Sequence, residues 1–424
     1  MFLVTAAEMR ECDLRTIEDQ HVQGQVLMER AARGLRRAIL KRYDDLNRRR
    51  ICIICGRGNN GGDGLLLARL FHDDGYNPRV FLTDPVSRIS GDAALQVLQL
   101  VDRGVPLESL SPELLPWIAA LSDRDIIVDA IVGTGFRGIL AGPNALAVEA
   151  IEASRARVIA VDIPSGLSAD SPLVPGPAVH AELTVTMGLP KRAFLFWPAR
   201  TYVGEWVCVD IGIPPEVVTA VHPVASLIDG PSVSRAVPPI PPYAHKGTRG
   251  KVLIVGGSPG LTGAPCMVAM SAGRAGAGLI RVCVPRSLNV IIEEKLTEEM
   301  SLPLPETETG HISGSALDLL LSLAEDWDVL VIGPGMGRSP DSDRLVREVY
   351  ARWPGQLLVD ADGLNALALQ GIPGRDPPLP PAVLTPHPGE MSRLSAHSPE
   401  EIAADPIGLA TSFSQRNGVV LVLK

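Results

Sequence analysis

The sequence predicts two α/β domains in tandem, each built on a parallel β-sheet with helices on both faces. Short, almost continuous apolar runs alternate with longer segments of helical periodicity, as is typical of strands buried on both faces. A proline-rich tract at residues 236–247 breaks this alternation, which then begins again. The length of 424 residues also suits two or three domains.

The first domain begins with helices, because apolar residues recur at near-helical spacing over residues 1–50. The apolar runs that follow are bounded by turn residues and predict strands. We expect these strands at residues 50–55, 79–83, 125–133, 157–164, 182–188 and 205–214. A Rossmann-like three-layer α/β/α domain follows from this order.

The second domain repeats the alternation after the proline-rich tract. Its strands are expected at residues 250–257, 278–285, 327–335, 356–363, 382–387 and 418–424. We place the boundary near residues 214–228, so that the domains comprise residues 1–220 and 224–424. The last strand has no segment after it to cover the sheet, which suggests that the second domain is incomplete.

The composition excludes several classes of protein. A net charge of −9 argues against a nucleic-acid-binding surface. No apolar stretch reaches the roughly 18 residues of a membrane-spanning helix, and the N-terminus lacks the apolar segment of a signal peptide. Six scattered cysteines are typical of a reduced compartment. We therefore expect a cytoplasmic protein without membrane or nucleic-acid partners.

A glycine-rich loop follows the first predicted strand. Gly56, Gly58 and Gly61 have the spacing G-x-G-x-x-G, and Asp84 ends the next strand. This pattern is typical of dinucleotide binding, so an NAD-dependent oxidoreductase is one interpretation. The simpler interpretation is structural: the glycines form a tight turn between the strand and the helix.

The same loop also carries polar residues that a pyrophosphate site does not need. These are Asn59, Asn60 and Asp63. A carboxylate in the first helical turn occupies the positive helix end that a pyrophosphate would use. The charge of the loop therefore argues against an ordinary dinucleotide site.

Four loops at the carboxyl ends of predicted strands are rich in polar residues, at positions 56–64, 129–138, 162–167 and 187–194. Ligands of open parallel sheets gather at these ends. The oxygens of Asn60, Asp129 and Ser165 suit a monovalent cation better than a transition metal. Arg137 is a candidate anion partner, and Asp162 is placed as a general acid or base or as a helix cap.

Motifs in order along the chain identify it as similar to a known family. The first half contains "TAAEMRECD", "GRGNNGGDG", "VDAIVGTGFRG", "VDIPSGLSAD" and "PKRAFLFWPARTYVGEWVCVDIGIP", which resemble NAD(P)H-hydrate epimerases. The second contains "HKGTRGKVLIVGGSPGLTGAP", "IGPGMG", "VDADGLN" and "LTPHPGEMSRL", which resemble the ribokinase-like ADP/ATP-dependent NAD(P)H-hydrate dehydratases. The two are commonly fused in one bifunctional enzyme that repairs nicotinamide nucleotides.

The resemblance implies functions for both halves. The epimerase interconverts the R and S forms of NADH or NADPH hydrated at the nicotinamide ring, and the dehydratase restores the S form with ADP or ATP and Mg²⁺. The implied catalytic residue is Asp162, and potassium is implied at Asn60, Asp129 and Ser165. The implied hydrate site comprises Asn59, Asn60, Gly61, Gly62, Asp63, Gly133, Thr134, Gly135, Phe136, Arg137, Gly138, Ile139 and Asp162.

In the second half the resemblance implies hydrate contacts at Ala264, at Gly335 or Gly337, and at His387, with Lys424 in the nucleotide site. The family's sequence continues into a phosphate loop and a glycine-rich anion hole that carries the catalytic base. These do not follow Lys424, so we expect a truncated dehydratase domain without activity. We also expect a homo-oligomer. The alternatives are an NAD-dependent oxidoreductase and a catalytically silent nucleotide-binding protein.

Overall fold

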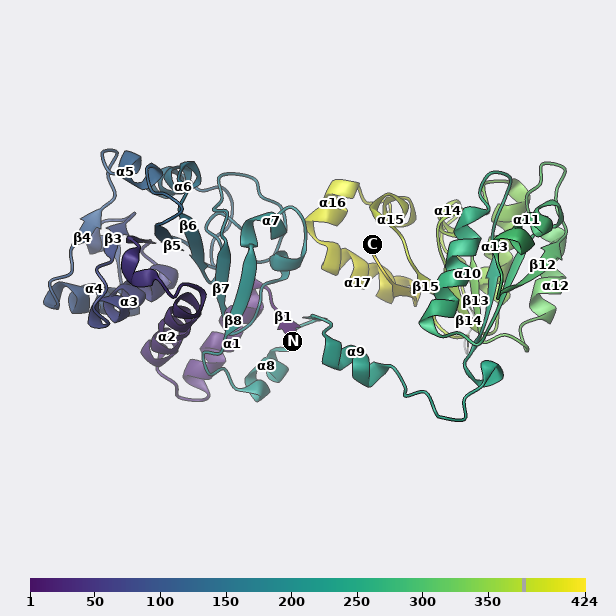
Figure 1. The fold of residues 1–424 in the computed structure, drawn as a ribbon, viewed down its shortest axis with the longest axis horizontal. Helices are drawn as coiled ribbons and strands as arrows, with labels where there is room; N and C mark the ends of the chain where they lie inside the picture. Colours follow the sequence, from purple (N-terminus) through teal and green to yellow (C-terminus); the bar gives the residue numbers. More distant parts are fainter. Residues whose placement is uncertain (376–378) are drawn as a thin grey trace. The chain divides into compact units, whose positions relative to one another are not determined.

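The computed structural model describes residues 1–375 and 379–424, which form two compact units (Figure 1). Unit 1 comprises Met1–Ala236 and unit 2 comprises Val237–Lys424. Each contains a seven-stranded parallel sheet, so the predicted fold class is confirmed. The domain limits expected from the sequence, residues 1–220 and 224–424, stay a prediction. Among the described residues, no helix is long and apolar enough to cross a membrane.

The sheet of unit 1 has the order β4-β3-β2-β5-β6-β7-β8. Every predicted strand is present, and only the three-residue β4 had not been expected, because it lacks an apolar run. The strands are β2 (Ile51–Cys55), β3 (Arg79–Leu82), β4 (Leu107–Ser109), β5 (Ile126–Ala130), β6 (Arg157–Val161), β7 (Leu183–Met187) and β8 (Glu205–Val209). A separate antiparallel pair joins β1 (Phe2–Leu3) to β9 (Ala225–Ser226).

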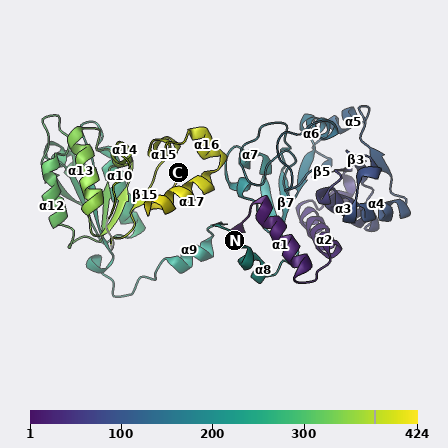
Figure 2. The ribbon, with the colours of Figure 1, turned by 180° about the vertical axis from the view of Figure 1, so that it is seen from behind.

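Helices cover both faces of this sheet (Figures 1 and 2). Ile53 and Cys55 pack with residues of α2, α3 and α4, whereas Cys52 and Ile54 pack with α5 and α6. Alternate residues of β2 thus enter opposite cores, as expected for a fully buried strand. The helices are α1 (Ala6–Glu18), α2 (Gly24–Arg42), α3 (Asn59–Asp73), α4 (Gly91–Asp102), α5 (Leu115–Ala119), α6 (Pro143–Ala153), α7 (Arg200–Val203), α8 (Pro215–Val221) and α9 (Gly230–Ala236).

The strand order of unit 1 reverses between β2 and β5. After β2 the chain builds outward through β3 and β4, and it then returns to the other side of β2 to form β5. Ligands bind outside the carboxyl ends of the strands at such a switch point. The loops that follow β2 and β5 are two of the four polar loops predicted from the sequence.

Unit 2 repeats this architecture, with the order β12-β11-β10-β13-β14-β15-β16 and a switch point between β10 and β13. Only β12 had not been predicted. The strands are β10 (Lys251–Val255), β11 (Leu279–Pro285), β12 (Met300–Leu304), β13 (Val329–Ile332), β14 (Gln356–Val359), β15 (Val383–Leu384) and β16 (Val420–Leu421).

The helices of unit 2 also divide between two faces. Ile254 and Val331 pack against α10 and α11, whereas Leu253 and Leu330 pack in the core with α12, α13 and α14. The helices are α10 (Gly263–Ala275), α11 (Asn289–Lys295), α12 (Leu317–Ser322), α13 (Pro340–Arg352), α14 (Asp362–Ala368), α15 (Pro388–Ser395), α16 (Pro399–Ala404) and α17 (Pro406–Asn417).

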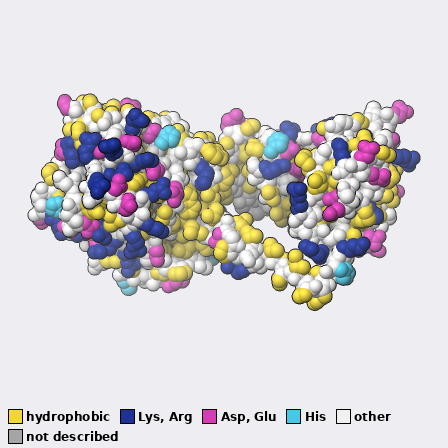
Figure 3. Space-filling model, in the orientation of Figure 1, with side chains coloured by type: hydrophobic (Ala, Val, Ile, Leu, Met, Phe, Trp, Pro, Cys, Tyr) yellow, Lys and Arg dark blue, Asp and Glu magenta, His cyan; other side chains and the backbone are white. Residues whose placement is uncertain are grey.

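Acidic side chains lie next to the basic side chains of α2 on the surface of unit 1. Figure 3 shows dark blue and magenta side chains side by side over this part of unit 1. Two of the contacts are ion pairs, Arg36 with Asp74 and Arg33 with Glu29. Exposed pairs of this kind contribute little to stability, on the order of 0 to 1 kcal/mol.

The close approach of β2 and β5 at the switch point predicts a strong effect of one glycine substitution. A Cβ at Gly56 would lie 1.9 Å from the carbonyl oxygen of Ile131, which is backbone and cannot yield. We expect Gly56→Ala to lower the free energy of unfolding by about 3 kcal/mol, measured by urea denaturation. Gly58→Ala is the matched control, because nothing lies within 4 Å of that Cβ. Equal stabilities of the two variants would contradict the packing described.

Candidate active site

The switch point of unit 1 opens into a cavity of about 990 Å³. A cavity of this size can hold a large organic ligand. Of the residues predicted to form the hydrate site, several line the cavity: Asn59, Asn60, Asp63, Gly133, Thr134, Gly135, Phe136, Arg137 and Asp162. The structure thus gathers residues from three polar loops around one space.

Four of the predicted residues do not line the cavity. Gly61 and Gly62 lie within the first turn of α3, where a Cβ would collide with the Gly56 carbonyl or with Met28. Gly138 and Ile139 also lie outside its lining. The two α3 glycines therefore serve the close packing of the helix start rather than the cavity wall.

Arg137 does not present a free guanidinium to an anion. It donates to Asp170 at 2.9 Å, and its side chain is 68% exposed. The prediction of Arg137 as an anion partner took no account of this carboxylate, which lies 33 residues further along the chain. A ligand anion has to compete with Asp170 for it.

Asp162 directly follows β6 and has a left-handed backbone, with φ of 63°. This conformation is uncommon for a residue other than glycine, costs about 1 to 2 kcal/mol, and persists only where the surroundings impose it. The Asp162 N–H donates to the Val185 carbonyl at 2.8 Å, which fixes the residue against β7. The carboxyl group is thereby directed to the cavity floor.

One oxygen of Asp162 is saturated with donors and the other is not. Oδ1 accepts hydrogen bonds from the Lys191 ammonium, from Met187 N at 3.0 Å and from the Thr186 hydroxyl at 3.2 Å. Among the hydrogen bonds of the described residues, none reaches Oδ2. Asp162 therefore presents a free carboxylate oxygen.

Lys191 was given no role in the sequence analysis, although it lies in the polar loop at residues 187–194. Its side chain is completely buried. Besides Asp162, the ammonium donates to the Thr186 hydroxyl at 2.8 Å and to the Met187 carbonyl at 3.2 Å. A buried charge requires such partners, since it has lost its hydration. Lys191 and Asp162 thus form one ion-paired group in the cavity wall.

Four further carboxyl groups line the cavity, and two of them, Asp13 of α1 and Asp63 of α3, are electrostatically coupled to Asp162. Burial raises the pKa of Asp63 well above its usual range, and the negative charges of Asp162 and Asp13 raise it further, against the lowering effect of Lys191. Burial and Asp162 raise the pKa of Asp13 to about 6. Asp13 is the second residue that sequence reasoning missed, because a charged residue on an amphipathic helix ordinarily faces solvent.

The predicted cation ligands lie together, with Asn60 in the cavity lining and Asp129 and Ser165 fully buried and outside that lining. Ser165 donates to Asp129 through Oγ at 2.6 Å and through its backbone N–H at 2.8 Å. Burial raises the pKa of Asp129 to about 6 despite these hydrogen bonds. Asn60 donates to the Val132 carbonyl at 3.0 Å, whose oxygen also lies 3.2 Å from Ser165 Oγ.

One atom of this group lacks a partner. The buried Oδ1 of Asn60 accepts no hydrogen bond. Together with the oxygens of Asp129, Val132 and Ser165, it forms an all-oxygen set, which suits an alkali cation. Within residues 1–375 and 379–424, no cluster of three or more His, Cys, Asp and Glu side chains is arranged to hold a metal ion.

The corresponding edge of unit 2 carries the predicted dehydratase residues. Gly335 lies against α10, where a Cβ would be 3.4 Å from the Cβ of Ala264. Gly337 N donates to Asp362 at 2.9 Å, which joins the loop after β13 to the start of α14.

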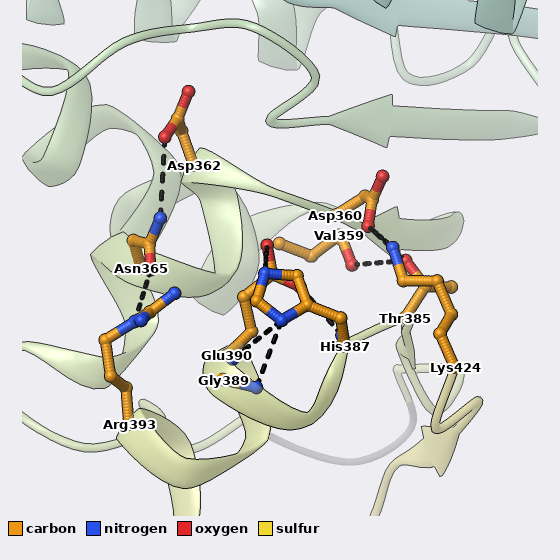
Figure 4. A network of polar contacts seen from close by, with 10 residues as sticks. All are labelled: Val359, Asp360, Asp362, Asn365, Thr385, His387, Gly389, Glu390, Arg393 and Lys424. Carbon is orange, nitrogen blue, oxygen red and sulfur yellow. Dashed lines mark hydrogen bonds and ion pairs between the residues drawn. The ribbon is translucent and has the colours of Figure 1, made fainter.

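The neighbouring strands complete this edge (Figure 4). Asp360 accepts from Lys424 at 2.8 Å and from the Thr385 hydroxyl at 2.7 Å. Burial raises the pKa of Asp360, but these two donors outweigh it, and the net pKa lies below the usual value. His387 caps α15 by accepting from Gly389 N at 3.0 Å, and its ring is half exposed.

Comparisons with known proteins show which family the two units belong to. Residues 24–193 match the family model described as YjeF-related protein N-terminus, and residues 252–424 match that of NAD(P)H-hydrate dehydratase. A bifunctional NAD(P)H-hydrate repair enzyme of Moorella thermoacetica is 40% identical over 432 residues, covering all of this chain and 80% of that protein. The chain belongs to the bifunctional NAD(P)H-hydrate repair enzymes.

Other relatives of this repair enzyme include one from Salinibacter ruber, 36% identical over all of this chain and 80% of that protein. Among solved structures, the ADP/ATP-dependent NAD(P)H-hydrate dehydratase of Bacillus subtilis, co-crystallised with ATP and Mg²⁺, is 26% identical. It has a TM-score of 0.37 and matches 46% of this chain and 64% of its own. The expected truncation is not supported, because the dehydratase match extends to residue 424.

The ion pair in the cavity wall predicts a stability change. We expect Lys191→Met to lower the free energy of unfolding by about 3 kcal/mol, because it leaves the Asp162 carboxylate without its cation. This is the low end for a broken buried pair, since Asp162 faces the cavity and water can reach it. Chemical denaturation measures the change.

The double variant Lys191→Met/Asp162→Asn is the control for this prediction. It removes both charges, so we expect it to regain much of the lost stability. A double variant no more stable than Lys191→Met would contradict the assignment of the loss to an unpaired charge.

Proposed function

We propose that unit 1 is the NAD(P)H-hydrate epimerase of this repair enzyme and that Asp162 is its catalytic carboxylate. The observation that supports this most directly is the geometry of Asp162, whose Oδ1 is fixed by Lys191 while Oδ2 remains free at the cavity. Epimerisation next to the ring nitrogen needs proton transfer and a stabilised cationic ring. One held carboxylate with one free oxygen can provide both.

The other predicted residues take supporting roles in this proposal. Asn59, Asn60 and Asp63 at the start of α3, and residues 133–137 after β5, line the cavity and bind the nucleotide. Asp84 also lines the cavity, which is the feature that an NAD-dependent oxidoreductase would need. Asp84 fits the epimerase equally well, because the hydrated cofactor carries the same nucleotide portion as NADH. Family membership therefore favours the epimerase over the oxidoreductase.

We further propose that Asn60, Asp129 and Ser165, with the Val132 carbonyl, hold a potassium ion. The unpartnered Oδ1 of Asn60 supports this assignment. A cation there supplies fixed positive charge beside a nucleotide that carries phosphates. The fully buried Asp129 carboxylate also gains a counter-charge that its hydrogen bonds to Ser165 do not provide.

Unit 2 is proposed as the dehydratase, which converts the S-hydrate to NAD(P)H with ADP or ATP and Mg²⁺. Ala264, Gly335, Gly337 and His387 are the proposed hydrate contacts, and they lie after the carboxyl ends of β10, β13 and β15 in the same sheet. Lys424 is proposed to contact the nucleotide. A homo-oligomeric state and a cytoplasmic location stay predictions from the sequence.

The epimerase proposal predicts a specific loss of activity. With the pure R-hydrate of NADH in potassium buffer, the chain should accelerate formation of the S form, followed by chromatography. Asp162→Asn should lower the rate about 100-fold or more, because the amide cannot accept the proton. Asp102→Asn, at the end of α4 and outside the cavity lining, is the control and should keep the wild-type rate. An unaccelerated wild-type reaction would refute the proposal.

The cation proposal predicts selective stabilisation of the folded chain. We expect the melting temperature to rise when KCl replaces tetramethylammonium chloride at constant ionic strength. The reason is that a bound potassium ion stabilises only the native state. Ser165→Ala should need about tenfold more potassium for the same shift, since one oxygen ligand is missing. Identical melting curves in the two salts would exclude a potassium site.

A further inference from the structure

Three carboxyl groups share one ammonium group in the cavity of unit 1. Asp13 comes from α1, Asp63 from α3, Asp162 from the end of β6 and Lys191 from the loop after β7, and all four line the same cavity. Lys191 is bound to Asp162 alone among the carboxyl groups. Within the described part of the chain, neither Asp13 nor Asp63 has a hydrogen-bond or ion-pair partner.

No other charge compensates Asp63. Of the other cationic side chains that line the cavity in the described part of the chain, Arg10 and Arg57 form no ion pair with its carboxyl groups, and Arg137 is paired with Asp170. Helix α2 contributes only uncharged residues to the lining, and α4 contributes another carboxylate, Asp92. Ionising Asp63 would therefore place a second negative charge beside the Lys191–Asp162 pair, which is unfavourable away from bulk water.

The contacts of Asp162 favour an ionised carboxylate, whereas the surroundings of Asp63 favour a protonated carboxyl group. Asp162 has three donors, one of them the Lys191 cation, and these stabilise a carboxylate. Asp63 has burial and two acidic neighbours, and these raise its pKa well above the usual range. Two titratable groups whose surroundings separate their protonation states are the arrangement required for an acid and a base in one site.

We propose that Asp63 is the catalytic acid of the epimerase site, working with Asp162 as the base, and that Lys191 is the positioning residue that keeps the two roles apart. This inference rests on the proposed epimerase function. It adds to the hydrate-binding role proposed for Asp63 a proton that the residue carries into the reaction.

The reaction can then be written with every atom accounted for. Asp63 gives its proton to the hydroxyl on the ring carbon next to nitrogen, the C–O bond breaks with its electron pair on oxygen, and water leaves. The nitrogen lone pair forms a C=N bond, and the Asp162 carboxylate stabilises the cationic ring. Water then adds to the opposite face: its electron pair forms the new C–O bond, the C=N π pair returns to nitrogen as its lone pair, and the extra proton of the water passes to Asp162 Oδ2. Transfer of that proton back to Asp63 through water restores the site.

The protonation of Asp63 can be measured without any substrate. In the full chain labelled with [¹³C]aspartate at the carboxyl carbon, Asp63→Asn identifies the Asp63 signal by its disappearance. We expect this signal to report a protonated carboxyl at pH values where an exposed aspartate, with a pKa of about 4, is ionised. A signal that titrates near that ordinary value would overturn the inference, whatever the activity of the chain.

Kinetics test the catalytic role. Asp63→Asn should lower kcat for the R-hydrate of NADH about 100-fold or more, with a smaller effect on KM, because the amide has no proton to give. The alkaline fall in rate, which reports loss of the Asp63 proton, should also disappear. Asp73→Asn makes the same change at the exposed end of the same helix and should leave kcat unchanged. A wild-type kcat in Asp63→Asn would overturn the inference while the epimerase function stands.

Lys191 has its own readout. In Lys191→Met the carboxylate of Asp162 lacks the cation that it contacts in the wild type, so the acidic limb of the pH–rate profile should move to higher pH. A merely structural loss would lower the rate equally at every pH, and that result would remove Lys191 from the proposal. An inactive wild-type chain would instead refute the epimerase function, and the carboxyl titration would still decide the protonation of Asp63.

Discussion

The ion pair between Lys191 and Asp162 constrains the whole epimerase site. A completely buried ammonium needs an anion and further acceptors. Asp162 is the anion, and the Thr186 hydroxyl and the Met187 carbonyl at the end of β7 are the further acceptors. The same contacts hold Asp162 in a left-handed conformation that costs free energy by itself. Stability and function are therefore coupled here, because the pair that satisfies the buried lysine also orients the free oxygen of Asp162.

The parallel sheet explains why these groups meet. In each unit the strand order reverses once, and in unit 1 the loops on either side of the reversal line an open space. In unit 1 the close contact of Gly56 with Ile131 keeps β2 and β5 together below that space. In unit 2, hydrogen bonds such as that from Gly337 to Asp362 connect adjacent strand ends. The two proposed sites thus lie at corresponding edges of the two parallel sheets.

The sequence predicted what depends on local pattern. Buried strands such as β2 and β6 are apolar runs, and Asn60 and Asp162 were predicted as site residues because they follow such runs. The strands β4 and β12 were missed, since one has three residues and the other contains Pro303. Lys191 and Asp13 could not be found, because burial of a charged residue depends on partners distant in sequence. The pairing of Arg137 with Asp170 was missed for the same reason.

The central claim is that one cavity holds an ionised and a protonated carboxyl group, separated by a buried lysine. Neutron diffraction from crystals of the full chain grown in D₂O at neutral pH tests it most directly, because deuterium is visible at each carboxyl. The account predicts deuterium on Asp63, none on Asp162, and three deuterium atoms on Lys191 Nζ. Deuterium on Asp162 together with a bare Asp63 carboxylate would contradict it.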